Sequence, residues 1–356
     1  MFENKSIIIG VSGGIAAYKT AYLVSALSKT EADVNVIMTE NACEFISPLV
    51  FETLTGNKCY VDTFDRNFKF DVEHISLAKK ADIFMIAPAT ANVIAKIANG
   101  IADDMLTTTF LASKCKKIVS PAMNTAMFEN QITQDNIAKL KKYGIGVVEP
   151  QNGLLACGDT GAGKMPEPDF LFDVIEREIA REKDMLGKKV LVTAGATMES
   201  LDPVRFLTNH SSGKMGFAIA KEAMLRGAEV TVVKANTTAA IPNFVKIVEV
   251  SSAKDMFDAV TALSDQQDII VKAAAVADYT PESYVDSKIK KKDGDLSIPL
   301  KRTMDILKYL GENKKEGQFL CGFSMETDNM LENSKAKLSK KNADMIAVSY
   351  THLTLP

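Results

Sequence analysis

The residues best suited by type and spacing to bind a ligand form two glycine-rich turns, one in each half of the chain. The first, residues 10–14, reads Gly-Val-Ser-Gly-Gly and stands between an apolar run and a helical pattern. In the second half the run 190–195 is followed, after a loop, by Ser-Ser-Gly-Lys-Met-Gly at 211–216. Glycines let a ligand approach the backbone, and the N–H groups and dipole of a helix N-terminus favour a phosphate. Two such turns suggest two phosphate-bearing ligands.

Two further turns in the first half carry a hydroxyl or an amide at the end of a predicted strand. Residues 88–92 (Pro-Ala-Thr-Ala-Asn) follow the predicted strand 83–87, and residues 121–124 (Pro-Ala-Met-Asn) follow the predicted strand 117–120. Each could be an ordinary turn whose polar side chain caps a helix, or it could bind a ligand. Together with the opening turn they would line one edge of a sheet, which favours a flat ligand.

Three side chains of the first half could bind a ligand or transfer a proton. His74, the only histidine there, could be a base near neutral pH or a residue at a helix start. Cys157 lies between glycines in a polar loop, where a core role is less expected than proton donation from a flap that closes over substrate. Glu40 could bind a ribose hydroxyl, although a surface residue at a helix start is the simpler interpretation.

The second half contains a run of small residues and several lysines. In segment 272–281 the alanines would let a base or ribose approach the backbone, and Asp278 could accept from a ribose hydroxyl, bind a metal or cap a turn. The basic run 288–292 could be a solvated surface, or with Lys337, Lys340 and Lys341 it could surround a triphosphate. Neither half contains a Walker A loop. Neither contains a GxGxxG motif, and the absence of that motif counts against a nicotinamide dehydrogenase.

Length and composition are those of an ordinary globular protein. The 356 residues suggest two domains, and 46% hydrophobic with 24% charged residues allow a normal core. The net charge of −3 does not imply a nucleic-acid surface. The five cysteines form no CxxC pair and, with three histidines, no metal-ligand spacing. We expect a cytoplasmic protein without a signal peptide or a membrane helix.

Short apolar runs alternate with helical patterns along the chain. This alternation predicts the α/β class, as two Rossmann-like domains, each a mostly parallel sheet with helices on both faces. A charged helical run, 168–183, precedes a new strand, so we place the boundary near 186 and expect domains 1–186 and 187–356. The predicted strands are 6–10, 34–38, 83–87, 117–120, 145–148, 189–193, 229–233, 246–249, 269–272, 318–322 and 345–348. The predicted helices are 15–28, 74–80, 91–100, 131–142, 214–226, 253–264 and 329–341. Two loops, 149–168 and 194–212, are longer than this fold requires.

These motifs, in this order, resemble the flavin-dependent cysteine decarboxylases and, with the second half, the bifunctional phosphopantothenoylcysteine decarboxylase/phosphopantothenate–cysteine ligases of bacterial coenzyme A synthesis. The resemblance runs from about residue 5 to about residue 348. One small departure is Thr90, where the family commonly has serine. The motifs of the first half are 13–19, His74, 88–92, 121–124 and 156–163, and those of the second are 209–216, 273–279, 288–290, 322–327 and 337–341.

The resemblance implies an FMN-dependent decarboxylase in the first half. FMN would accept electrons from the cysteine side chain, so that the neighbouring carboxylate leaves easily, and would return them afterwards. In this family His74 would be the base or proton shuttle, Asn124 would bind the departing carboxylate, and Cys157 would protonate carbon during the return reduction. The residues implied to hold FMN are Ser12, Gly13, Gly14, Thr39, Pro88, Ala89, Thr90, Ala122 and Met123.

The resemblance implies a CTP-dependent ligase in the second half. It would join 4′-phosphopantothenate to L-cysteine through an acyl cytidylate, with release of pyrophosphate and CMP. Lys288 would stabilise charge on the phosphoryl group, Asn209 would orient the acyl intermediate, and Mg²⁺ is expected with CTP, its ligands unassigned. The residues implied to bind CTP are Gly213, Lys214, Gly216, Ala273, Ala274, Ala275, Asp278, Met304, Asp305, Ile306, Leu307, Phe323, Lys337 and Lys341.

The resemblance also implies assembly, as a trimer or larger shell of decarboxylase halves with the flavin between subunits and as dimers of ligase halves. Nucleic-acid and membrane partners are not expected. The family pattern leads us to expect several tens of further residues after Val348, so segment 349–356 looks like a truncated or misread end. Two alternatives remain: a flavin decarboxylase with an inactive ligase half, and a regulatory flavoprotein without catalysis.

Overall fold

The computed structural model describes residues 2–63, 73–156, 158–290, 297–326 and 330–350. By their internal contacts the residues form two compact units, Met1–Arg181 and Glu182–Pro356. In the described part of the chain, every helix is too short or too polar to cross a membrane.

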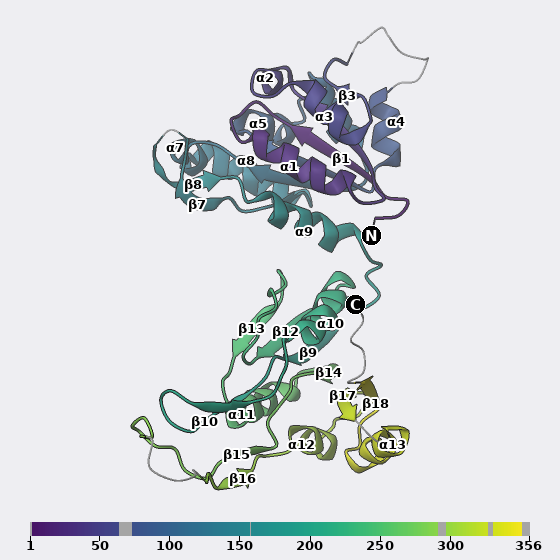
Figure 1. Ribbon diagram of the computed structural model, residues 1–356. Helices are drawn as coiled ribbons and strands as arrows, with labels where there is room; N and C mark the ends of the chain where they lie inside the picture. Colours follow the sequence, from purple (N-terminus) through teal and green to yellow (C-terminus); the bar gives the residue numbers. More distant parts are fainter. Residues whose placement is uncertain (1, 64–72, 157, 291–296, 327–329, 351–356) are drawn as a thin grey trace. The chain divides into compact units, whose positions relative to one another are not determined.

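The first unit, coloured purple to teal in Figure 1, contains a six-stranded parallel sheet with the strand order β3-β2-β1-β4-β5-β6. Its strands are β1 (Ser6–Val11), β2 (Asp33–Met38), β3 (Cys59–Tyr60), β4 (Ile83–Ala89), β5 (Lys116–Pro121) and β6 (Gly146–Val147). Its helices are α1 (Ala17–Ser28), α2 (Glu40–Cys43), α3 (Pro48–Thr55), α4 (Glu73–Lys80), α5 (Ala91–Ala98), α6 (Met105–Ala112), α7 (Thr125–Glu129), α8 (Gln131–Lys142) and α9 (Pro168–Ile179). An antiparallel hairpin joins β7 (Gln151–Leu154) to β8 (Thr160–Lys164).

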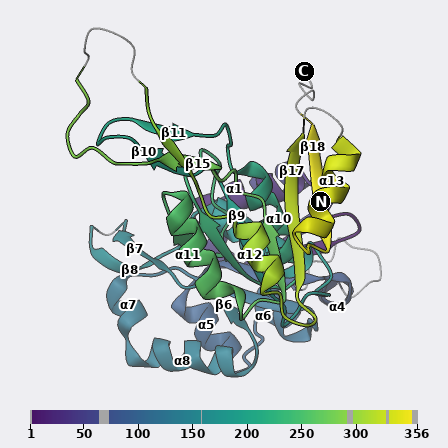
Figure 2. The same ribbon diagram turned by 90° about the horizontal axis from the view of Figure 1, so that it is seen from below.

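The second unit repeats this arrangement as a parallel sheet in the order β13-β12-β9-β14-β17-β18. Its strands are β9 (Lys189–Ala194), β12 (Glu229–Lys234), β13 (Lys246–Glu249), β14 (Ile269–Lys272), β17 (Phe319–Glu326) and β18 (Met345–Tyr350). Its helices are α10 (Lys214–Leu225), α11 (Ala253–Ser264), α12 (Ile306–Glu312) and α13 (Met330–Lys340), the last packed beside β17 and β18 (Figure 2). Two small ribbons, β10 (Met198–Ser200) with β11 (Phe206–Thr208) and β15 (Tyr279–Pro281) with β16 (Leu300–Arg302), complete it.

Each sheet is buried on both faces because its strands are almost uniformly apolar. In β1, Ile7 and Ile9 pack into a core with α1 and α9, whereas Ile8 packs into the opposite core with α5 and α6. The second sheet is enclosed in the same way, with α10 against one face and α11 and α12 against the other. The predicted α/β class and the predicted strands are confirmed.

The two long loops predicted from the sequence contain short antiparallel ribbons. Loop 149–168 contains β7 and β8, and loop 194–212 contains β10 and β11. In both sheets the strand order reverses beside the first strand, between β1 and β4 in one unit and between β9 and β14 in the other. Ligands of such folds bind at this reversal, outside the carboxyl ends of the strands.

Candidate functional sites

In the first unit, Ser12 joins the two strands at the reversal point. Its buried hydroxyl donates to the Pro88 carbonyl at 2.7 Å and accepts from the Thr90 N–H at 2.9 Å. The single hydroxyl proton of Ser12 is therefore used within the protein. Ser12 therefore holds the opening turn and the turn after β4 at a fixed distance from each other. A ligand bound at this edge would contact both turns.

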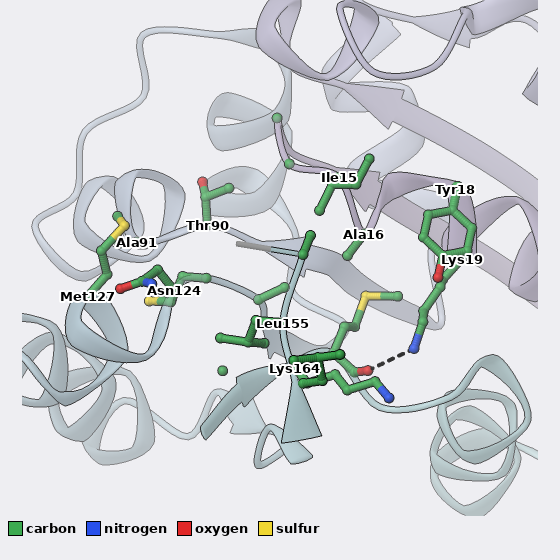
Figure 3. Close-up of a pocket in the computed structure, with 18 residues that line it drawn as sticks. Ile15, Ala16, Tyr18, Lys19, Thr90, Ala91, Asn124, Met127, Leu155 and Lys164 are labelled. Carbon is green, nitrogen blue, oxygen red and sulfur yellow. Dashed lines mark hydrogen bonds between the residues drawn. The ribbon is translucent and has the colours of Figure 1, made fainter. Parts of the chain in front are cut away.

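Two adjoining cavities, of about 420 and 580 Å³, lie at this edge of the sheet, and both are lined by Gly13, Thr90 and Met127. The smaller has mainly apolar walls, which include Ile15 and Leu155 (Figure 3). Of the nine residues predicted to hold FMN, seven line one or both of these cavities. These are Gly13, Gly14, Thr90, Ala122 and Met123 around the smaller cavity, with Ser12 and Thr39 around the larger. Pro88 and Ala89 line neither, because they end the buried strand β4.

Three of the predicted ligand-binding side chains cap helices. Thr39 accepts from Ala42 N–H, Thr90 from Val93 N–H and Asn124 from Ala126 N–H. The capping interpretation of these turns is correct, but it does not exclude binding. A threonine that caps a helix uses only a lone pair of its oxygen, so its O–H is left to donate to an anion.

The hairpin of β7 and β8 is seated on the turn that follows β5. The Met123 N–H donates to the Gly163 carbonyl at 3.1 Å, and the Asn124 amide donates to the Asp159 carboxylate at 2.8 Å. A Cβ on Gly163 would lie 2.3 Å from the Met123 oxygen, and Gly163 has a φ of +128°, so only glycine fits. Gly163 therefore lets the hairpin pack closely against the turn that follows β5. Cys157, predicted to be the proton donor at its tip, lies outside the described residues.

Lys19 ends the motif 13–19 but was given no role from the sequence, and in the structure it links α1 to the end of the hairpin. Its buried ammonium donates to the Glu167 carboxylate at 2.8 Å and to the Met165 carbonyl at 3.3 Å. The hydrogen bond from Lys19 holds the pKa of Glu167 below its usual value. A lysine in the otherwise apolar pattern of α1 was the available signal.

His74 is half-buried near the start of α4 but is not among the residues that line either cavity of the first unit. Glu40 is exposed and begins α2, while Thr39 provides the cap. These are the positions of His74 and Glu40 within one chain.

In the second unit, a cavity of about 480 Å³ opens at the ends of β14 and β17, beside the N-terminus of α12. Sequence reasoning assigned residues from four separate motifs to CTP, and eight of them meet here. They are Asp278, Met304, Asp305, Ile306, Leu307, Phe323, Lys337 and Lys341. Lys272 and Arg302 add positive charge that was not predicted.

Two of the lysines in this cavity are held by protein groups. Lys337 donates to the Phe323 carbonyl at 3.1 Å and approaches the Ser324 hydroxyl at 3.3 Å. Lys341 pairs with Asp305, whose carboxylate also caps α12 through the Lys308 N–H. Burial would raise the pKa of Asp305, but these two hydrogen bonds outweigh it and hold the pKa below its usual value.

The glycines and alanines predicted to bind CTP make contacts within the second unit. A Cβ on Gly216 would lie 2.7 Å from that of Ala194, so glycine lets α10 lie against β9. The N–H groups of Ala274 and Ala275 are used by Thr193 and Gly195 of the neighbouring segment. The residues predicted to bind CTP that do not line the cavity are Gly213, Lys214, Gly216, Ala273, Ala274 and Ala275.

The two predicted catalytic residues of the second unit also lie outside the cavity lining. Asn209 and Lys288 are exposed, on the segments after β11 and β15. Sequence reasoning missed Asp202, a buried carboxylate that accepts from the Val204 and Arg205 N–H groups at 2.8 Å and from the Ile289 N–H at 3.1 Å. Asp202 therefore holds the backbone beside Lys288. In the described residues, no group of three acidic, histidine or cysteine side chains is arranged to hold a metal ion.

Comparison with protein families assigns each unit to a class. Residues 1–180 match the flavoprotein family, and residues 185–353 match the DNA/pantothenate metabolism flavoprotein C-terminal domain. A flavoprotein domain is thus followed by a domain of pantothenate metabolism.

Similar full-length proteins identify the particular family. The chain is 46% identical over 352 residues to the coenzyme A biosynthesis bifunctional protein CoaBC of Bacillus subtilis, covering 98% of this chain and 86% of that protein. It is 42% identical to the protein of the same name from Borreliella burgdorferi, covering 97% and 89%. The chain belongs to this family of bifunctional coenzyme A biosynthesis enzymes, the phosphopantothenoylcysteine decarboxylase/phosphopantothenate–cysteine ligases, as the motifs predicted.

Solved structures resemble one half of the chain at a time. The C-terminal domain of a CoaBC protein is 47% identical and covers 46% of this chain and 78% of its own, with a TM-score of 0.41. A mutant PPC decarboxylase complexed with pantothenoylaminoethenethiol is 30% identical and covers 48% of this chain and 96% of its own, with a TM-score of 0.44.

Proposed function

We propose that the second unit ligates 4′-phosphopantothenate and L-cysteine with CTP, and that the first unit decarboxylates the product to 4′-phosphopantetheine with FMN. The observation that carries the proposal is the meeting of eight residues from four sequence motifs in one cationic cavity of the second unit. Family membership supports the same pair of reactions. We also propose the domain boundary near residue 186 and a cytoplasmic location.

The edge of the first sheet fits FMN in shape and polarity. A Cβ on Gly14 would have only the Thr90 methyl nearby, at 3.8 Å, so a ligand can occupy that space. The apolar cavity suits a flat ring system. Thr39 and Thr90 line the larger cavity, and in the proposal their O–H groups donate to the phosphate. FMN would supply the electron acceptor for oxidation of the cysteine side chain.

Around that group, each residue has a defined task in the proposal. Asn124 binds the substrate carboxylate through its amide, His74 takes and returns a proton, and Cys157 protonates carbon in the last step. Because His74 does not line the cavity of its own chain, we propose that a neighbouring subunit supplies it. An exposed apolar stripe at α1 supports such an assembly, with Ile15, Tyr18 and Tyr22 each more than half exposed, at 58%, 52% and 67%.

In the second unit, the acceptor carboxylate attacks the α-phosphate of CTP and releases pyrophosphate, and the cysteine amine then displaces CMP. Lys337 and Lys341 bind the nucleotide, Mg²⁺ accompanies it, Lys288 stabilises the phosphoryl charge and Asn209 orients the acyl cytidylate. Phe206 of β11, Val204 in the turn before it and Tyr284 after β15 are exposed, and they support the proposed dimerisation of this unit.

The visible absorption spectrum of the purified protein is the first test. We expect flavin bands, and FMN released on denaturation. Pyrophosphate release with CTP, Mg²⁺, cysteine and 4′-phosphopantothenate then tests the ligase, and carbon dioxide release tests the decarboxylase. A colourless protein that does not take up FMN would refute the proposal for the first unit, and a protein without CTP-dependent pyrophosphate release would refute it for the second.

A further inference from the structure

Lys272 is the one lysine lining the cavity of the second unit for which the described structure provides no hydrogen bond or ion pair. It is the last residue of β14, at the point where the strand order reverses between β9 and β14. Its neighbours in the cavity differ, because Lys337 is held by Phe323 and Ser324, and Lys341 by Asp305. A half-buried ammonium without a partner is costly unless another group supplies one.

The charged groups around Lys272 come from several of the elements that enclose the cavity. Asp278 lies on the segment after β14, Asp305 caps α12, and Arg302 stands at the end of β16. Lys337 of α13 and Lys341, which directly follows this helix, are further cations near it. The two carboxylates are opposed by three cations, and Asp305 is already engaged by Lys341. The cavity as a whole therefore offers an excess of positive charge to an anion.

We propose that Lys272 binds the polyphosphate of the nucleotide in this cavity, as a residue of the substrate site beyond those assigned by the family motifs. The inference rests on the proposed ligase function. The bound phosphate oxygens would supply the partner that the described protein lacks, whereas Lys337 and Lys341 must share their protons with protein acceptors. Lys272 therefore contributes more to the affinity for the nucleotide than Lys337 or Lys341 does.

Burial lowers the pKa of Lys272 to about 8, with smaller opposing contributions from the neighbouring acids and bases. A bound polyphosphate would raise this pKa again, because it favours the charged form. Proton linkage then requires that nucleotide affinity be full below pH 8 and fall as the pH rises above it. Between pH 7 and pH 9 the loss is about tenfold for one group with this pKa.

Calorimetric titration of CTP with Mg²⁺ into the flavin-loaded protein tests the inference at pH 7 and pH 9. We expect wild type to bind about tenfold more weakly at pH 9 and to take up protons on binding near pH 8. Lys272→Met should bind at least about tenfold more weakly at pH 7, without further loss at pH 9. Lys272→Arg, which keeps its charge, should bind about equally at both pH values. Lys254→Met, which removes an exposed lysine paired with Asp258, is the matched control and should behave as wild type.

Thermal unfolding provides a readout independent of activity. Lys272→Met should unfold at a higher temperature than wild type at pH 7, because an unpartnered charge is removed, and should show a smaller stabilisation by CTP. If the methionine variant does not fold, the pH dependence of CTP binding by Lys272→Arg still tests the inference.

Three results would overturn the inference. Equal CTP binding by wild type and Lys272→Met at both pH values would remove Lys272 from the site while leaving the ligase proposal intact. Weaker binding of 4′-phosphopantothenate with unchanged CTP binding would assign the ammonium to the phosphate of the acceptor instead. Absence of CTP binding by wild type would refute the ligase proposal itself and this inference with it.

Discussion

The Ser12 hydroxyl shows how one buried side chain can define a binding edge. We expect Ser12→Ala to lower the free energy of unfolding of the first unit by about 1–2 kcal/mol, because it leaves the Pro88 carbonyl and Thr90 N–H without this partner. Flavin should also dissociate more easily. Denaturant unfolding and flavin fluorescence measure the two effects.

Ser28→Ala is the control for this change, because the Ser28 hydroxyl is enclosed without a hydrogen-bond partner in the described structure. It should change the unfolding free energy by less than about 0.5 kcal/mol. Similar losses in both variants would mean that the bridge between β1 and β4 contributes nothing specific.

Asp202 acts through the backbone of the segment that carries Lys288. Asp202→Asn replaces an acceptor of three N–H groups with an amide that offers one oxygen, so the Ile289 anchor should loosen. We expect kcat for pyrophosphate release to fall by about tenfold or more, with a smaller change in the KM for CTP and unchanged flavin content. Asp286→Asn, an exposed change in the same segment, should leave the kinetics as in wild type. An unaltered kcat in Asp202→Asn would exclude this positioning role.

Sequence reasoning found residues that stand in motifs and missed those defined by their surroundings. Asp278, Lys337 and Lys341 were predicted and do meet in one cavity. Lys272 ends an apolar strand, and neither its exposure nor its lack of a partner is visible in the sequence. Glycines 213 and 216 were interpreted as phosphate ligands, but the structure shows in addition that packing requires them.

At the scale of elements, the β7–β8 hairpin determines how the first cavity is closed. Gly163→Ala would place a methyl group against the Met123 oxygen at a φ that alanine rarely adopts, so the hairpin should lift from the turn after β5. We expect at least about tenfold slower carbon dioxide release and faster proteolysis in segment 151–164, while CTP-dependent pyrophosphate release is retained.

Gly153→Ala is the matched change in the same hairpin. Its Cβ would make only an ordinary contact, 3.4 Å from Lys164, and its φ is not in the left-handed region. It should leave decarboxylation as in wild type. Resistance of Gly163→Ala to proteolysis, with normal carbon dioxide release, would contradict the proposed seating of the hairpin.

The predicted strands are present because each is a short apolar run buried on both faces, which composition alone reveals. The small antiparallel ribbons were not predicted, because their strands are not apolar runs buried on both faces. Strands β10, β11, β15 and β16 have three residues each, and their pairing depends on contacts made after folding. Helices α2 and α7 are similarly short and depend on the caps from Thr39 and Asn124.

At the scale of the whole molecule, one strand order occurs twice, and each sheet has a cavity at the carboxyl ends of its strands, beside β1 and β4 in the first unit and beside β14 and β17 in the second. The two units nevertheless use this edge differently. The first has apolar walls and capped turns, and the second has a cluster of lysines from β14, from α13 and from the residue that follows α13. The proposed reactions therefore have separate sites, and a change at one should spare the other.

The position of His74 leads to a prediction about the assembled enzyme. If a neighbouring subunit supplies His74, two variants that are inactive alone should restore each other when co-expressed. His74→Asn removes the base, and Asn124→Asp keeps the helix cap but replaces the amide donor with a carboxylate that repels the substrate carboxylate. In randomly mixed assemblies about a quarter of the sites would combine an intact His74 with an intact Asn124 from different chains. We expect carbon dioxide release at about that fraction of wild type, with pyrophosphate release unaffected in either variant. A mixed assembly that binds FMN and remains without carbon dioxide release would mean that both residues must belong to one chain, and the proposed sharing of the site would be wrong.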